Sequence, residues 1–172
     1  MDSHFHPTLL SGCSLAATTK EAQFRVNYPN SRGRVSRIFA LDQIAAEAMY
    51  AIVDDPWNGA HFITVVPNQE SIKSSALALS NPDGTATNLA TELDGADIAI
   101  LIASDGNSAG AAEAIARFAF ERKIMIVGLA LAKPKAQLTS ETVVSTLRQF
   151  ASVLVVAEDE TFIPAMLTAL RA

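Results

Sequence analysis

The sequence has few of the residues that build disulfides and metal sites. Its 172 residues include one cysteine, Cys13, and three histidines. A single cysteine excludes a disulfide framework within the chain and a cysteine-based metal site. A reactive Cys13 thiol, or a metal pair at His4 and His6, would lack the partner groups that such sites need. We therefore predict no metal site and assign no catalytic residue.

Long apolar runs and clustered basic charge are also missing. No stretch approaches the ~18 uninterrupted apolar residues of a membrane span. The first residues, MDSHFHPTLLSGC, have neither the basic charge nor the apolar run of a signal peptide. The net charge is −5, and the 13 Lys and Arg residues are scattered apart from SRGRVSR at 31–37. We therefore expect a cytoplasmic protein that binds neither a membrane nor nucleic acid, since both partners require clustered basic residues.

Three common motifs are absent as well: G-x-S-x-G, the Walker loop and G-x-G-x-x-G. A hydrolase, a P-loop protein and an ordinary dinucleotide-binding protein would each lack the motif of its class. What the sequence does contain is 49% hydrophobic and only 18% charged residues, which predicts a packed chain. A chain of 172 residues is long enough for one domain with a sizeable core.

The hydrophobic pattern changes near the end of the first fifth of the chain. Residues 1–33 lack periodicity and contain several prolines and glycines, which predicts an irregular N-terminal arm, and residues 34–172 are the predicted α/β domain. Apolar runs typical of strands occur at 35–41, 61–66, 97–103, 124–131 and 153–157. Helical patterns occur at 42–55, 72–79, 86–93, 108–123, 140–151 and 161–172, with a turn at NPDGT.

The predicted strands determine the fold class. Runs such as DIAILIA and IMIVGLA are apolar at every position, as in strands that helices cover on both faces. Right-handed crossovers between alternating strands and helices give a parallel sheet. We predict a single three-layer, doubly wound, Rossmann-like α/β domain with a mostly parallel sheet of about five strands. The residues expected in its central parallel strands are Ile98, Ile100, Leu101, Ile126, Val127, Leu154 and Val155.

The stretch SDGNSAG, which joins the strand at 97–103 to the next helix, is the strongest functional signal. Ligands bind open parallel sheets at the carboxyl ends of strands, and a helix start offers unpaired N–H groups and a positive dipole end. Gly106 and Gly110 permit positive φ, while Asn107 and Ser108 can cap the helix or hydrogen-bond a ligand. The predicted ligand-binding loop is Ser104, Asp105, Gly106, Asn107, Ser108, Ala109 and Gly110. The alternative is that these residues only cap the helix and turn the chain.

Four further polar residues lie at predicted strand ends and complete the predicted site: Asp42, Asn68, Lys133 and Asp159. Asn68 can contact a base or a ribose, and Lys133 can neutralise a phosphate. Asp105 would repel a phosphate unless a cation such as Mg²⁺ lies between them. Helix capping is the alternative role for Asp42 and Asp159, a turn for Asn68 and a surface position for Lys133.

The stretch LDGADIAILIASDGNSAGAAEAIARFAFERKIMIVGLAL resembles the tubulin/FtsZ GTPase family. LDGAD, GNSAGAA and IVGLAL stand where that family has an L-x-G-A-D segment, a glycine-rich signature loop and a strand ending near V-G-V-V. SVLVVAEDETFIPAM is similar to that family's strand, Asn-Asp turn and helix. The resemblance covers residues 92–166 and implies a tubulin-like nucleotide domain, a nucleotide with Mg²⁺ as ligand, and assembly into homo-oligomers.

The sequence also departs from that family. The signature loop is shorter and keeps only Gly106 and Gly110, FALDQIAAEAM has no glycine-rich first loop, and the catalytic acidic loop has no counterpart. Without these parts, rapid phosphoryl transfer has no charge clamp or water activator. We predict a regulatory protein that binds a nucleotide or another small anion without hydrolysing it. The alternatives are a tubulin-like self-association module without ligand and a small-molecule enzyme that uses Asp42, Asp105 and Asp159.

Overall fold

The structure, a computed structural model, describes residues 33–66, 77–104, 108–131, 141–158 and 160–172. Gly33–Ala172 form one compact unit. The arm predicted at 1–33 lies outside the described residues except for Gly33. Within the described ranges, no helix is both long enough and apolar enough to cross a membrane.

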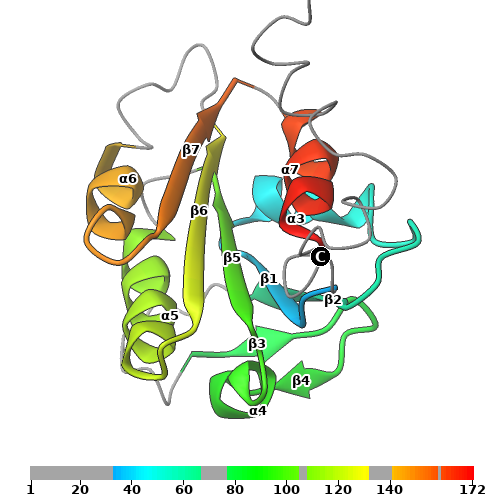
Figure 1. Cartoon of the computed structure of the whole chain (residues 1–172), viewed down its shortest axis with the longest axis horizontal. Helices are drawn as coiled ribbons and strands as arrows, with labels where there is room; N and C mark the ends of the chain where they lie inside the picture. Colours follow the sequence, from blue (N-terminus) through cyan, green and yellow to red (C-terminus); the bar gives the residue numbers. More distant parts are fainter. Residues whose placement is uncertain (1–32, 67–76, 105–107, 132–140, 159) are drawn as a thin grey trace, which may run out of the picture. The chain divides into compact units, whose positions relative to one another are not determined.

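The described residues form one seven-stranded sheet and five helices (Figure 1). The strands are β1 (Ser36–Ala40), β2 (Ala60–Val65), β3 (Leu79–Ser80), β4 (Ala86–Thr87), β5 (Ile98–Ala103), β6 (Met125–Leu131) and β7 (Val153–Ala157). The helices are α3 (Gln43–Tyr50), α4 (Leu89–Leu93), α5 (Ala109–Glu121), α6 (Glu141–Leu147) and α7 (Phe162–Leu170). The strand order is β4-β3-β2-β1-β5-β6-β7. The strands β2, β1, β5, β6 and β7 are parallel, whereas β3 is antiparallel to both β2 and β4.

The predicted α/β class and mostly parallel sheet are confirmed, but the sheet has seven strands instead of about five. The five predicted strands correspond to β1, β2, β5, β6 and β7. The two additional strands, β3 and β4, were predicted as parts of helices at 72–79 and 86–93. The Ala- and Leu-rich composition of this region favours a helix locally, but pairing with β2 provides hydrogen bonds that override this weak preference.

The β3–β4 hairpin contains the turn that the sequence predicts at NPDGT. The Asn81 N–H donates to the Thr85 carbonyl at 2.9 Å, and the Gly84 N–H donates to the Asn81 carbonyl at 2.9 Å. Gly84 has φ +83°, a conformation that glycine adopts at no steric cost. The Asp83 carboxylate accepts bonds from the Thr85 N–H at 2.9 Å and the Thr85 hydroxyl at 2.6 Å. These bonds reverse the chain and bring β4 beside β3.

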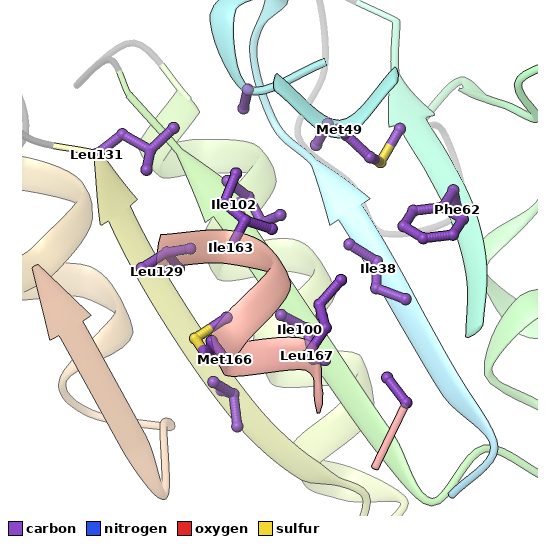
Figure 2. Packing of buried hydrophobic residues seen from close by; sticks show 14 of the residues in the cluster. Ile38, Met49, Phe62, Ile100, Ile102, Leu129, Leu131, Ile163, Met166 and Leu167 are labelled. Atoms are coloured by element: carbon purple, nitrogen blue, oxygen red, sulfur yellow. The ribbon is translucent and has the colours of Figure 1, made fainter. Parts of the chain in front are cut away.

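The buried hydrophobic residues form two clusters. All six residues of β5 are buried, and alternate residues of this strand belong to two separate clusters. Ile100 and Ile102 lie in the first cluster with residues of α3 and α7 (Figure 2). Leu101 lies in the second cluster with residues of α4, α5 and α6. Figure 1 shows α5 and α6 on one side of the sheet and α3 and α7 on the other.

The prediction of central strands is confirmed for β5 and β6, but it is wrong for β7. β5 and β6 are parallel neighbours and hold the predicted core residues of both strands. β7, with Leu154 and Val155, is parallel to β6 and is the last strand of the sheet that the described residues form. Val153 and Val156 of this strand are exposed. An apolar strand sequence predicts burial, but it does not determine whether a second strand lies beyond it.

Candidate functional site

The strand order reverses between β1 and β5. After β1 the chain continues to β2 on one side, then passes β1 again and places β5, β6 and β7 on the other side. β1 and β5 are parallel with Ala40 opposite Ile102, and the Leu41 N–H extends their ladder by donating to the Ile102 carbonyl at 2.9 Å. Their carboxyl ends therefore lie side by side. This position is the one at which open α/β sheets bind ligands.

Asp42 and Ser104, two of the predicted site residues, meet at this point. The Ser104 N–H donates to Asp42 Oδ2 at 2.6 Å, and the Ser104 hydroxyl donates to Asp42 Oδ1 at 2.6 Å. Oδ1 also accepts the Ala45 N–H at 2.9 Å, so Asp42 caps α3 as the capping interpretation predicts. We name this arrangement the Asp42–Ser104 clasp.

The clasp gives both residues a positioning role. Ser104 is only 6% exposed, and both of its donors point to Asp42, so its remaining hydrogen-bonding capacity toward a ligand is that of an acceptor. The carboxylate of Asp42 accepts bonds from the Ala45 N–H, the Ser104 N–H and the Ser104 hydroxyl. Carboxylates held in this way stabilise local geometry, and they are poorly placed to remove a proton from a substrate. The clasp therefore fixes where the loop after β5 begins.

The start of α5 defines the other end of the loop. Ser108 is buried and occupies the N-cap position with φ −83°, and its side chain makes no capping bond. Ala109 and Gly110 are the first two residues of α5. Gly110 is therefore helical, as the predicted helix at 108–123 implies, and it does not use the positive φ that glycine permits. This first helical turn follows β5 along the chain, and the first N–H groups of a helix have no partner within the helix.

The other predicted site residues are not placed by the structure. Asp105, Gly106 and Asn107, between β5 and α5, lie outside the described residues, as do three predicted residues elsewhere: Asn68, Lys133 and Asp159. Their roles remain predictions from the sequence. Among the residues that the structure describes, no group of three or more His, Cys, Asp or Glu side chains could hold a metal ion.

A second polar cluster lies at the amino ends of β1 and β2, and the sequence did not predict it. Glu92 of α4 is buried, and its Oε2 lies 2.7 Å from His61 Nδ1 on β2. The Thr87 hydroxyl on β4 donates to Glu92 Oε1 at 2.5 Å. Arg37 Nε on β1 donates to the Glu92 carbonyl at 2.6 Å and lies 3.6 Å from Oε2. We name Arg37, His61, Thr87 and Glu92 the Glu92 cluster.

One sequence signal could have marked Glu92 as a buried carboxylate: its position between Leu89 and Leu93. Leu89 and Leu93, which lie three residues before Glu92 and one after it, are buried, so Glu92 lies on the side of α4 that faces the sheet. Arg37 and His61 are cross-strand partners on β1 and β2. A carboxylate on the buried side of a helix needs such cationic partners. The partners lie 55 and 31 residues away along the chain, so local patterns do not reveal them.

Comparison with known proteins adds no assignment. No protein-family model matches this chain, and no curated protein matches it significantly. The likeness of residues 92–166 to the tubulin/FtsZ family therefore stays a prediction from the sequence.

Proposed function

We propose that Gly33–Ala172 is a three-layer, doubly wound domain that binds a small anion or a nucleotide without hydrolysing it. The binding site is the space beyond the carboxyl ends of β1 and β5. The observation that carries the proposal is the reversal of strand order between these two strands, where the Asp42–Ser104 clasp lies. Such reversals leave a crevice between loops that diverge to opposite faces of the sheet.

The start of α5 supports an anionic ligand. The helix has 13 residues and no acidic residue in its first turn, so its positive dipole end is not neutralised there. Ala109 and Gly110 have the smallest side chains available, which permits close approach to the backbone N–H groups. Two or three such donors at about 1 kcal/mol each, with a dipole term of roughly 0.5–1 kcal/mol, correspond to micromolar to millimolar affinity.

The clasp supports binding without turnover. Hydrolysis requires a group that orients or deprotonates water and a clamp for the developing charge. Asp42 already accepts three hydrogen bonds from Ala45 and Ser104. Asp42 therefore holds α3 and Ser104 in position, which disfavours the alternative of an enzyme that uses Asp42 as its general base.

Calorimetric titration with GTP, ATP and inorganic phosphate, with and without Mg²⁺, tests this function. Gly110→Val should weaken binding about tenfold or more, because the added side chain lies on the first turn of α5. Phe120→Val places the same residue near the far end of α5, at a position that is 59% exposed, and should leave binding unchanged. If the wild type releases no heat with any of these compounds, residues 104–110 only cap and turn the chain.

Self-association is the second candidate function, and β7 favours it. This last strand reads VLVVA, contains no charged residue or proline, and exposes Val153 and Val156. Natural sheets usually protect a last strand with such residues because its free backbone groups pair readily with another chain. Sedimentation velocity at increasing protein concentration would detect assembly, and Val156→Lys should abolish it. A monomer at all concentrations rules this function out.

A further inference from the structure

The Glu92 cluster connects α4 and the adjoining β4 to β1 and β2, which are distant from them in sequence. Glu92 lies on α4, Thr87 on β4, His61 on β2 and Arg37 on β1. α4 has five residues, and β3 and β4 have two each. Elements of this length have little stability of their own. They are attached by the β2–β3 ladder, by the buried Leu79, Leu89 and Leu93, and by polar side-chain contacts that centre on Glu92.

His61 is the member of the cluster whose charge changes with protonation. The side chain of Glu92 is 7% exposed and that of His61 is 42% exposed, so the imidazole can exchange protons with water while it contacts a buried carboxylate. Arg37 keeps its charge at all physiological pH values, but its Nε hydrogen bond goes to the Glu92 carbonyl. The contact of Arg37 with Oε2 is the longer one, at 3.6 Å, compared with 2.7 Å for His61.

A second carboxylate also senses the charge of His61. The pKa of Asp83 in the hairpin turn lies below its ordinary value, chiefly because the Thr85 hydroxyl donates to it. The Thr85 N–H adds to this effect, and the charge of His61 makes the smallest contribution. When His61 is protonated, the Glu92 carboxylate has two cationic partners, His61 and Arg37. When His61 is neutral, Arg37 is the cation that these contacts leave beside Glu92.

We propose that His61 is a proton-operated latch that fastens α4 and the β3–β4 hairpin to β1 and β2. The imidazolium form strengthens the contact with Glu92, and loss of the proton loosens it. Histidine changes its charge between about pH 5 and 8, so the latch is tighter at the acidic end of this range. The sign follows from the pairing: the charged form gains an opposite charge at 2.7 Å, and a buried carboxylate tolerates the loss of a cation poorly.

Amide hydrogen exchange at pH 5.5 and 8.0, corrected for the intrinsic exchange rates, tests the latch. The amides of α4 and the hairpin should be about tenfold more protected at the lower pH, while those of β5 and β6 should not change. His61→Gln keeps a hydrogen-bond donor without the titrating charge and should remove the difference. A wild type without this pH dependence, or a His61→Gln variant that retains it, overturns the proposal.

A second measurement covers the case in which His61→Gln fails to fold. In the wild type, the NMR shifts of the Thr91 and Leu93 amides and of the His61 ring should follow a common titration midpoint. Different midpoints would show that protonation of His61 does not act on α4, which overturns the proposal. The test does not involve the carboxyl end of the sheet, so its outcome is independent of the ligand-binding proposal.

Discussion

The two ends of the sheet are each held by one carboxylate, but the partners differ in kind. At the carboxyl ends of β1 and β5, Asp42 accepts bonds from two backbone N–H groups and one hydroxyl. At the amino ends of β1 and β2, Glu92 contacts a hydroxyl, an imidazole and a guanidinium. Asp42 is partly exposed and Glu92 is buried. The second carboxylate lies where cationic partners replace lost hydration.

This difference shows how burial selects the partners of a carboxylate. A partly exposed carboxylate keeps contact with water, so water and backbone N–H groups together can satisfy its oxygen atoms. A buried carboxylate loses that water, and removal of one cation then leaves an uncompensated charge. Changes near Glu92 should therefore cost more stability than comparable changes near Asp42.

The largest loss is expected for Arg37→Met. Arg37 has a side-chain exposure of 17% and Glu92 of 7%, so the methionine would leave the carboxylate with His61 as its remaining cation. We expect the free energy of unfolding to fall by about 3 kcal/mol in urea titrations. Arg117→Met, which breaks the exposed pair with Glu113, is the matched control and should cost less than about 0.5 kcal/mol. Equal effects of the two substitutions would contradict the importance of burial.

An intermediate loss is expected for Asp42→Ala. The substitution removes the cap of α3 and leaves the Ser104 N–H without its acceptor, at a cost of about 2 kcal/mol in unfolding free energy. Asn88→Ala is the control, because Asn88 caps α4 through the Thr91 N–H and should cost about 1 kcal/mol. If thermal or urea unfolding gave the same loss for both, the bonds between Asp42 and Ser104 would contribute nothing beyond the cap.

The smallest effects should come from removal of one hydroxyl at each end. Thr87→Val and Ser104→Ala are close in shape to the residues that they replace, and each should cost about 1 kcal/mol in unfolding free energy. Thr87→Val should lower the free energy of unfolding more than Ser104→Ala does. Thr87 donates to Glu92 Oε1, whereas Asp42 Oδ1 still accepts the Ala45 N–H when the Ser104 hydroxyl is removed. A greater loss for Ser104→Ala in the same urea titrations would reverse the order of the two sites.

The sequence predicted the long elements well and the short ones poorly. β5 and α5 were predicted to within one or two residues, since a fully apolar run and an Ala-rich helical pattern are strong local signals. β3 and β4, with two residues each, carry no periodicity that could identify them. At the candidate site, Asp42 was predicted as a cap from its position before a helix, but its bond to Ser104 depends on the adjacency of β1 and β5.

Local sequence was enough to identify the five long strands, because hydrophobic periodicity acts between residues a few positions apart. The burial of β5 also follows from the sequence, since every residue of this strand is apolar. Only the tertiary structure decided the strand order, and with it the meeting of Asp42 with Ser104 and of Glu92 with His61 and Arg37. These pairs are separated by 31 to 62 residues, and their contacts follow from sheet pairing, which depends on the free energy of the whole core.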